Sequence, residues 1–368
     1  MAKPYTVGIF SFNTEAISFC DNTKKTSGFF SKCVLPDFVD DVAARFLDWS
    51  PDILAVGLQE SAIPGDKLID AFAGALKKGY FSERASQHGY IKIHQDRLTG
   101  LGQEGFLGFV RGLRLALFIR DDLFVVPASR YRISTGSYRC SKQTLGKGAL
   151  SATLTLPNPI KALPGAPQTG LKNVKYQFIT AHLPYLADDI SGGQGLAARN
   201  DCMNGIYSKL IDGQDNDNVF LFGDLNYRIV LSEGQTDTDL VREIGLNLTG
   251  EGDTITATQY DQLMSTKLPG GFKEGLVVGG KSFGPNYMPT CKLVKKRGKE
   301  CDFELNSPTG GSSECYVTSK GLSPRVPSWC DRILYSSDQL EPAIYTSLNS
   351  GNIRLSDHSA VVANFFPK

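Results

Sequence analysis

The sequence predicts an α/β protein in which two mixed β-sheets lie face to face with helices outside. Short apolar runs rich in Val, Ile and Phe, bounded by polar segments, are typical of buried strands. Four early runs lead to polar residues, namely Val7–Phe10 to Asn13, Ile53–Val56 to Glu60, Tyr176–Ile179 to His182, and Val219–Phe222 to Asp224 and Asn226. Two late runs follow polar residues, namely Ile333–Tyr335 after Asp331, and Ala360–Ala363 after Asp357 and His358. These polar groups can meet on one edge only if the late strands run antiparallel to the early ones.

Between these runs, helical and extended patterns alternate along the chain. Helices are expected over Pro36–Asp48, Gly65–Lys78, Ala197–Asp212 and Thr238–Glu243, and further strands over Leu113–Ile119 and Ser151–Leu156. The stretch 295–324 is rich in Lys, Gly, Ser and Cys, and predicts a long loop that is either a lid or recognition loop or a surface insertion. Because the candidate site residues are spread from Asn13 to His358, we expect residues 1–368 to form one domain.

Composition argues against several classes of protein. The chain has 368 residues, 41% of them hydrophobic and 21% charged, as in ordinary soluble globular proteins. Its net charge of +1 and pI near 7.5 argue against a bulk polyanion-binding surface, so no nucleic-acid partner is expected. No apolar stretch reaches the roughly 20 residues of a membrane span, and the start lacks a secretory signal. We therefore expect a cytoplasmic protein that is a monomer. Its eight cysteines show no CxxC spacing, so reduced thiols are expected.

The segment Phe222–Arg228 carries the strongest single motif. Asp224 ends a predicted strand, and Asn226 lies on the same side of an extended segment. One of these groups can act as a base toward water while the other orients the water or binds phosphate. Taken alone, Gly-Asp-x-Asn favours a turn, because the same residues are good turn formers.

The other strand-end residues complete the inventory of a metal-assisted hydrolase. Glu60 offers a hard oxygen ligand that suits Mg²⁺, although in isolation it is also a typical helix-starting acid. Two of the four histidines, His182 and His358, fall at strand ends. Asp357 and His358 are adjacent, so one can serve a metal and the other the substrate. An imidazole held by a second carboxylate is a stronger partner for phosphate, and Asp331 is the candidate holder.

Three motifs resemble the signatures of inositol polyphosphate 5-phosphatases: Gly223–Arg228, Pro327–Leu334 and Ser356–His358. Further matches to that family are Gln59–Glu60, Lys147–Ala149, Ala181–Leu183, Asp261–Leu263, Gly271–Gly275 and Pro289–Lys292. The family belongs to the endonuclease/exonuclease/phosphatase superfamily with the DNase I-like fold. The resemblance implies a four-layer α/β/β/α sandwich. It also implies Mg²⁺-dependent removal of the 5-phosphate from a phosphoinositide or a soluble inositol polyphosphate.

The resemblance also assigns roles to the metal and water side of the site. Glu60 would bind Mg²⁺, assisted by Asn13. Asp224 would activate or orient the attacking water, with Asn226 beside it.

On the phosphate side, His182 and His358 would contact the scissile group. Asp331 would hold His358, and Asp357 would complete the network on the metal side. A dication and fixed donors are needed in any case, because charge spreads over the phosphoryl oxygens during transfer.

Departures from the family pattern affect the substrate-binding residues. The family usually has Pro-Thr-Tyr-Lys where this chain has Cys291, which leaves Lys292 as the remaining 4-phosphate contact. Ser323 replaces a Lys of the family, whereas Arg325 is kept and Lys320 lies nearby. The remaining substrate-binding candidate is Lys147, where Gly146 replaces the usual Asn before it. The basic segment 292–299 is either a solvated loop or a grip for adjacent phosphates or for an anionic membrane, which would make the protein peripheral there.

Two other functions remain open from the sequence. The first is a DNase I-like nuclease or abasic-site endonuclease, which the near-neutral charge and the Trp-Cys-Asp-Arg run oppose. The second is a catalytically inactive phosphoinositide-binding module, which the retention of every catalytic position opposes.

Overall fold

Two six-stranded mixed sheets form the centre of the molecule. The computed structural model describes residues 4–15, 18–19, 33–34, 36–61, 65–78, 89–99, 112–125, 131–140, 146–157, 172–186, 194–230, 261–275, 277–278, 281–282, 284–285, 287–291, 293, 303–305, 314–316, 327–348 and 356–368. In spatial order the first sheet contains β17 (Leu340–Leu348), β18 (Ala360–Pro367), β1 (Val7–Asn13), β4 (Ile53–Ser61), β6 (Gly112–Arg120) and β5 (Tyr90–Thr99). The second contains β11 (Lys273–Glu274), β16 (Asp331–Ser337), β10 (Asn218–Asp224), β9 (Val174–His182), β8 (Gly148–Leu156) and β7 (Arg132–Arg139).

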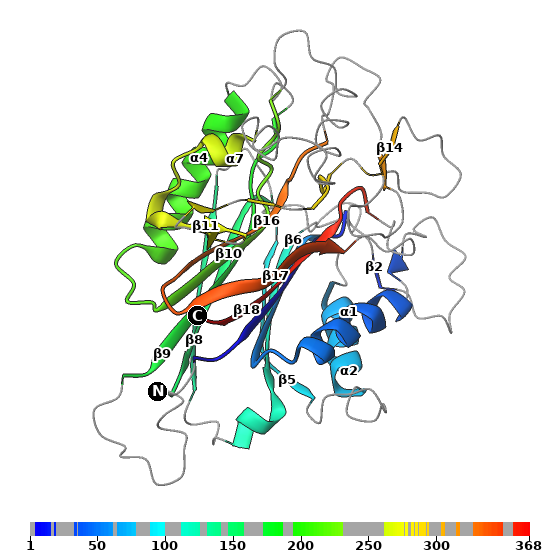
Figure 1. The fold of residues 1–368 in the computed structure, drawn as a ribbon, viewed down its shortest axis with the longest axis vertical. Helices are drawn as coiled ribbons and strands as arrows, with labels where there is room; N and C mark the ends of the chain where they lie inside the picture. Colours follow the sequence, from blue (N-terminus) through cyan, green and yellow to red (C-terminus); the bar gives the residue numbers. More distant parts are fainter. Residues whose placement is uncertain are drawn as a thin grey trace.

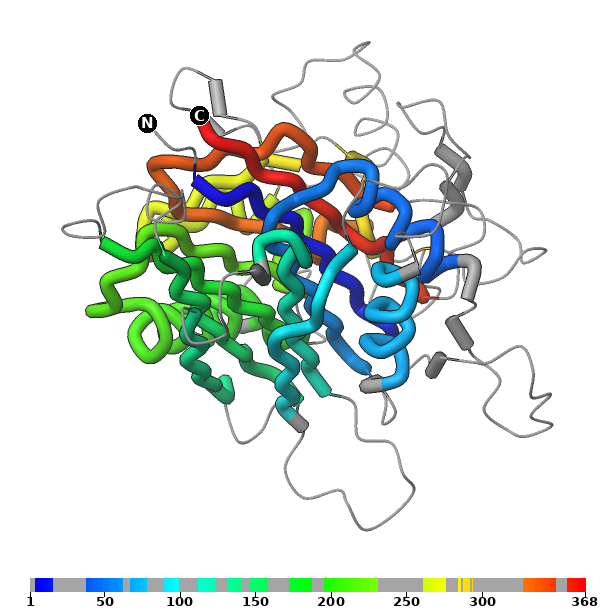
Figure 2. The backbone as a smooth tube through the Cα atoms, turned by 90° about the horizontal axis from the view of Figure 1, so that it is seen from below, coloured from blue at the N-terminus to red at the C-terminus, as the bar shows by residue number. Residues whose placement is uncertain are grey.

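The two sheets share one pattern of strand directions. In each, a parallel pair occupies the centre, β1 with β4 and β10 with β9. The late strands β18 and β16 pair antiparallel with β1 and β10, as the sequence predicts. Figure 2 shows this for the first sheet, where the blue N-terminal strand runs beside the red C-terminal strand.

Helices cover the outer face of each sheet. On the first sheet lie α1 (Pro36–Trp49) and α2 (Gly65–Lys78), whose buried apolar side chains pack on β1, β4 and β6. On the second lie α4 (Gln194–Ile206), the π-helical turn η4 (Tyr207–Ile211) and α7 (Gln262–Ser265). Figure 1 shows the two helical layers on opposite sides of the paired sheets. The predicted α/β/β/α sandwich is therefore confirmed.

Shorter elements complete the described part of the chain. They are the 3-10 turns η2 (Asp121–Val125) and η5 (Pro269–Gly271), and the strand pairs β2 (Ser18–Phe19) with β3 (Cys33–Val34), β12 (Val277–Val278) with β13 (Lys281–Ser282), and β14 (Phe303–Leu305) with β15 (Glu314–Tyr316). The β14–β15 pair falls inside the predicted loop 295–324, and the rest of that loop lies outside the described residues. The predicted helix Thr238–Glu243 also lies outside them. None of the described helices combines the length and the hydrophobicity of a membrane-spanning segment.

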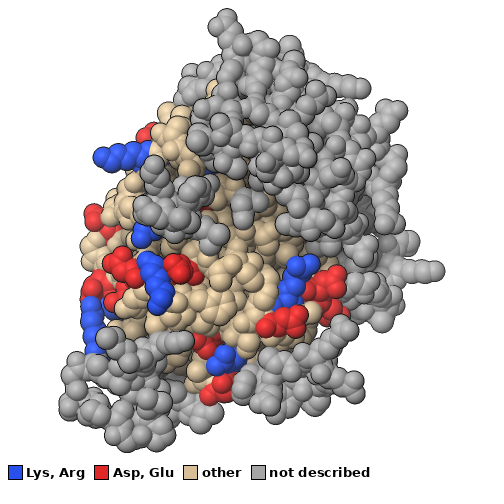
Figure 3. All heavy atoms as spheres, viewed as in Figure 1, with Lys and Arg blue, Asp and Glu red and all other residues tan. Residues whose placement is uncertain are grey.

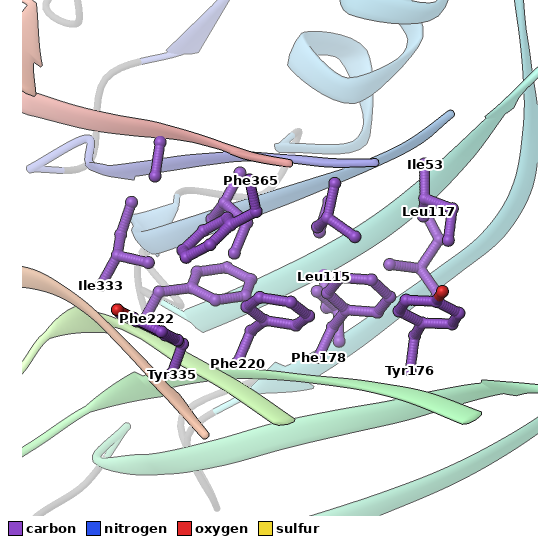
Figure 4. Close-up of a cluster of buried hydrophobic side chains, with 14 of the residues drawn as sticks. Ile53, Leu115, Leu117, Tyr176, Phe178, Phe220, Phe222, Ile333, Tyr335 and Phe365 are labelled. Carbon is purple, nitrogen blue, oxygen red and sulfur yellow. The ribbon is translucent and has the colours of Figure 1, made fainter. Parts of the chain in front are cut away.

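The core between the sheets consists of large side chains that interdigitate from both sides. Phe178 and Phe220 stack with ring centroids 5.5 Å apart, and Phe365 from the opposite sheet meets Phe220 edge-on at 4.9 Å. Figure 4 shows this row of rings between the two sheets. Such pairs add stability beyond the area that they bury.

One cysteine pair corrects the expectation that all eight cysteines are reduced. Cys140, directly after β7, is disulfide-bonded to Cys202 of α4. No sequence pattern indicates this bond, because the two residues are 62 positions apart and no spacing rule joins them. The bond ties an edge strand of the second sheet to the helix that covers it.

Arg332 forms a buried ion network that fastens β11 to β16. Its guanidinium group is completely buried. Nε donates to Glu274 at 2.6 Å, Nη2 makes a second bond to the same carboxylate, and Nη1 donates to Asp261 at 2.6 Å. Arg332 therefore compensates the charge of two buried carboxylates.

We expect Arg332→Met to lower the free energy of unfolding by about 3–5 kcal/mol, because it leaves buried carboxylates without their counterion. Urea unfolding at equilibrium measures this. The matched control is Lys92→Met, since Lys92 pairs with Asp70 at the surface and such a pair contributes at most about 1 kcal/mol. Equal losses in the two variants would contradict the argument.

Candidate active site

The site lies where the inter-sheet core reaches one edge of both sheets. Every second residue of a strand faces this core. Along β9 and β10 the inward-facing side chains end in His182 and Asp224, beyond the aromatic residues Phe178 and Phe222. The core thus changes from apolar to charged along each strand.

A layer of neutral polar groups joins the two sheets directly beneath the charged residues. Gln59 of β4 is completely buried, and its Nε2 donates to Ser11 Oγ at 3.3 Å and to Thr180 Oγ1 at 3.0 Å. Ser11 lies on the same sheet as Gln59, whereas Thr180 lies on the opposite one. This amide therefore fixes the spacing of the sheets close to the site.

Glu60 reaches the site because β4 is irregular at this position. Gln59 faces the core, so in a regular strand Glu60 would face the helices. Instead the register with β6 shifts between Leu58 and Ser61, and Glu60 has a positive φ of 49°. A β-bulge of this kind re-aims a side chain. Glu60 Oε1 accordingly lies 3.8 Å from His182 Nε2.

Asp224 is the centre of the cluster. In register, it lies opposite His182 on one side and Asp331 on the other. One carboxylate oxygen accepts a hydrogen bond from Asn13 Nδ2 at 2.8 Å and lies 3.2 Å from His182 Nε2. The other accepts from the backbone N–H of Asn226 at 3.1 Å. Although burial raises its pKa, the neighbouring His358, His182 and Lys147 hold the pKa of Asp224 well below its usual range.

The chain around Asp224 adopts a conformation that requires particular residues. Gly223 has a φ of 142°, and a Cβ there would collide with the carbonyl oxygen of Ala181 on the neighbouring strand. Asn226 has a φ of 55°, in the left-handed region that Asn tolerates. Its side chain donates to the carbonyl oxygen of Leu183 at 3.0 Å, and it accepts from Arg228.

His358 and Asp331 form a buried pair beside Asp224. His358 Nδ1 lies 2.7 Å from Asp331 Oδ2, and the Asp331 backbone N–H donates to Thr290 Oγ1 at 3.0 Å. Burial alone would lower the pKa of His358, but the charges of Asp331 and Asp224 raise it to about 10. Burial raises the pKa of Asp331 to about 6, against the opposing effect of His358. Near neutral pH the pair is therefore an imidazolium with a carboxylate.

His182 carries the opposite electrostatic character. Lys147, directly before β8, places its Nζ against His182 Nε2, and Gly148 pairs with His182 in register. Burial and then the charge of Lys147 lower the pKa of His182, against the effect of Asp224. The two histidines thus differ, with His182 neutral and His358 charged.

The donor set fits a divalent cation. Asp224, Asp331 and His358 each offer one ligand atom, and these three atoms lie within 4.8 Å of one another. A metal-bound imidazole must be neutral, however, and the raised pKa of His358 opposes this. The side of the site with Glu60 and Asn13 supplies a carboxylate and an amide, which are the oxygen ligands that Mg²⁺ and Ca²⁺ prefer.

The structure brings together most of the residues that the sequence singles out. Asn13, Glu60, Lys147, His182, Asp224, Asn226, Asp331 and His358 form the cluster described above. Asp357 lies at its rim, with Oδ1 3.9 Å from His358 Nε2. Lys292, Lys320 and Arg325 lie outside the described residues.

Sequence reasoning gave no role to two residues that support the cluster, Glu15 and Ser356. Glu15 lies beside it, where its backbone N–H donates to Asn13 Oδ1 at 3.0 Å and its side chain accepts from the backbone N–H of Asp357 at 3.4 Å. Ser356 donates to the carbonyl oxygen of Asn13 at 2.7 Å. The position of Glu15 two residues beyond the end of β1 was the only sign of its role.

We expect Asp331→Asn to lower the pKa of His358 from about 10 toward the ordinary histidine value, because it removes the nearest negative charge. The measurement is an NMR titration of the histidine ring protons in EDTA, where the chain's four histidines give few signals. In Asp215→Asn, an exposed control, the pKa of His358 should stay the same. An unchanged pKa in Asp331→Asn would contradict the assigned pair.

Known proteins resemble this chain in sequence. The model of endonuclease/exonuclease/phosphatase family 2 matches residues 165–364, over half of the chain. Type IV inositol polyphosphate 5-phosphatase 9 of Arabidopsis thaliana is 32% identical over 151 residues, which are 41% of this chain and 30% of that protein. Polyphosphatidylinositol phosphatase INP53 of Saccharomyces cerevisiae is 28% identical over 153 residues, 42% of this chain and 11% of that protein. The chain spans less than a third of the length of these relatives.

Solved structures resemble it in fold. The inositol polyphosphate 5-phosphatase domain of synaptojanin, in complex with inositol (1,4)-bisphosphate and a calcium ion, has a TM-score of 0.60 at 21% identity, covering 99% of this chain and 84% of that one. Cimex nitrophorin in a ferrous NO complex has a TM-score of 0.55 at 18% identity, covering 99% of both chains. These likenesses agree with the predicted DNase I-like sandwich. The family match extends over the segment that carries Asp224, Asp331 and His358, so the chain belongs to endonuclease/exonuclease/phosphatase family 2, and the curated relatives that it matches include inositol polyphosphate 5-phosphatases.

Proposed function

We propose that this protein is a divalent-cation-dependent phosphomonoesterase that removes the 5-phosphate from a phosphorylated inositol. The observation that carries the proposal is the convergence of Asp224, His182, His358 and Glu60, from distant parts of the sequence, into one buried cluster. The named activities of the curated relatives, inositol polyphosphate 5-phosphatases among them, supply the substrate class.

The proposed chemistry is direct attack of water on phosphorus. Asp224 is held as a carboxylate, so it accepts a hydrogen bond from the attacking water and orients it, with Asn226 beside it. His358, held as an imidazolium by Asp331, donates to a phosphoryl oxygen. His182 and Lys147 contact the same phosphate from the other side. Positive charge placed in advance around the transferring group is the main source of catalysis in such reactions.

We further propose that Glu60 and Asn13 hold a Mg²⁺ ion, with Asp357 completing the network at the rim of the site. Such an ion, when bound, neutralises charge on the phosphoryl oxygens and lowers the pKa of a bound water. The calcium ion in the synaptojanin structure supports a divalent cation for that protein, and we extend it to this chain.

The substrate side of the proposal concerns basic residues. Lys147 would bind substrate phosphate, and the same role is proposed for Lys292, Lys320 and Arg325. We propose one catalytic domain over residues 1–368 that acts as a cytoplasmic monomer, on either a soluble inositol polyphosphate or a lipid at the surface of an anionic membrane.

The described charges on one face of the molecule support this substrate class over duplex DNA. On the face drawn in Figure 3, the described Lys and Arg side chains are interspersed with Asp and Glu side chains. Duplex binding depends on a basic face that neutralises many phosphates. A single ring phosphate needs only the cations inside the site.

We expect Asp224→Asn and His358→Gln each to lower phosphate release at least ~10²-fold, since each removes a group that acts in the transition state. The assay is phosphate release from a panel of inositol phosphates and short-chain phosphoinositides with Mg²⁺, with abasic duplex DNA as the alternative substrate. The matched controls are Asp215→Asn at the surface and His94→Gln on β5. Cleavage of the duplex without phosphate release from the panel would replace the proposal with an endonuclease.

We expect Mg²⁺ or Ca²⁺ to raise the melting temperature of the protein above its value in EDTA, because a ligand that binds only the folded state adds about 2.7 kcal/mol at 100 times its Kd. Glu60→Gln and Asn13→Ala should each reduce this rise, whereas Asp215→Asn should keep it. Scanning calorimetry measures all four proteins. A full rise in Glu60→Gln would remove Glu60 from the proposed cation site.

A further inference from the structure

Two cysteines lie against each other beside the catalytic cluster. Cys291 and Cys330 have no exposed surface, and their Sγ atoms are 2.9 Å apart. A disulfide bond joins its sulfur atoms at about 2.05 Å, so less than about 1 Å of approach separates this contact from a covalent bond. The proposed reaction gives neither thiol a role.

Both cysteines are connected through the backbone to the Asp331–His358 pair. Cys330 directly precedes Asp331, and Cys291 forms a β-bridge with His358. Cys291 Sγ also accepts a hydrogen bond from Arg228 Nη1 at 3.4 Å. The two sulfurs are therefore each linked through the backbone to one member of the Asp331–His358 pair.

We propose that Cys291 and Cys330 form a reversible disulfide that switches the site off. The effect on activity rests on the proposed function, whereas formation of the bond does not. The oxidant is hydrogen peroxide, which accepts two electrons from the two thiols. One thiol loses its proton, and its sulfur attacks one oxygen of the peroxide. The O–O bond breaks, a sulfenic acid forms, and the leaving hydroxide takes up that proton as water. The second sulfur then attacks the sulfenic sulfur, the S–S bond forms, and the hydroxyl group leaves as a second water with the remaining thiol proton.

Closing this bond disturbs the site geometry. When the sulfurs approach each other, both the segment that carries Asp331 and the segment that pairs with His358 move. Catalytic groups must be held to within about 0.5 Å of their working positions. A misplacement of about 1 Å can cost ~100-fold in rate. We expect the oxidised protein to lose activity at least tenfold and to regain it on reduction.

Peptide mapping of the full chain tests the bond directly. Trypsin places Cys291 in the peptide 282–292 and Cys330 in the peptide 326–332, and each peptide contains one cysteine. The folded protein is treated with hydrogen peroxide, its remaining thiols are alkylated, and it is digested without reductant. Mass spectrometry should show the two peptides joined. Because both sulfurs are buried, the cross-link should accumulate more slowly than an exposed thiol reacts. The Cys140–Cys202 bond provides an internal positive control, since its peptides should be joined before peroxide is added.

Cys291→Ser is the matched variant, because a hydroxyl group of similar size can still accept from Arg228. It should keep the activity of the reduced protein and lose the cross-link and the peroxide sensitivity together. A wild-type protein without the joined peptides after peroxide would overturn the proposal. A joined pair with unchanged activity would overturn the regulatory role. Inactivity of the reduced wild-type protein on every phosphate ester would instead refute the proposed function, while the cross-link would still report on the thiol pair.

Discussion

Two carboxylates buried on adjacent strands impose the main constraint on this structure. Asp224 and Asp331 lie opposite each other in register, and neither is more than 2% exposed. Ligand atoms of the two carboxylates lie within 4.8 Å of each other. Two negative charges this close repel strongly in the protein interior, where the dielectric constant is low. His358, as an imidazolium, compensates the charge of Asp331. The carboxylate of Asp224 is stabilised by the amide of Asn13, the backbone N–H of Asn226 and the imidazole of His182. The cluster thus contains negative groups for the proposed cation and positive groups for the proposed phosphoryl group.

The shared pattern of the two sheets explains how these groups come together. A central parallel pair sends the C-terminal ends of both its strands to the same edge of a sheet. With such a pair in each sheet, Asn13, Glu60, His182 and Asp224 arrive at one edge. The antiparallel strands β16 and β18 then begin at that edge, which adds Asp331 and His358. Convergence is therefore a consequence of topology, and the residues need no proximity in sequence.

Much of this was predictable from the chain, because strand ends are marked locally. The boundaries of α2 and the antiparallel direction of β16 and β18 follow from apolar patterns and from the side on which each polar residue stands. The resemblance to a family then supplied the order of layers. The placement of Glu60, in contrast, depends on a feature that no local pattern marks. Alternation alone would turn its side chain toward the helices, and only the bulge in β4 reverses that.

Contacts between distant segments leave no local mark. Nothing near Arg332 in sequence indicates that Asp261 and Glu274 neutralise it, although both stand in motifs that match the family. The Cys140–Cys202 bond escaped notice for the same reason. In the sequence, Cys291 stands out only because it replaces a residue that contacts substrate in the family. Its contact with Cys330 depends on how two loops pack against each other. The sequence thus identifies the acids and bases, while the supporting residues depend on tertiary contacts.

The likeness to nitrophorin shows why the charged edge, and not the sandwich, carries the argument for function. That protein shares the fold over 99% of this chain but is described as a ferrous NO complex. A fold positions strand ends without fixing their chemistry. In this chain the side chains between the sheets are aromatic in the core, neutral and polar at the Gln59–Thr180 hydrogen bond, and charged at the edge. The edge carries two carboxylates and two histidines, one with a lowered pKa and one with a raised pKa. A gradient of that kind costs stability at its charged end, which a purely structural edge would avoid with apolar or singly charged residues. The proposed cation and phosphoryl group therefore depend on this charged edge, and the shared sandwich alone does not supply them.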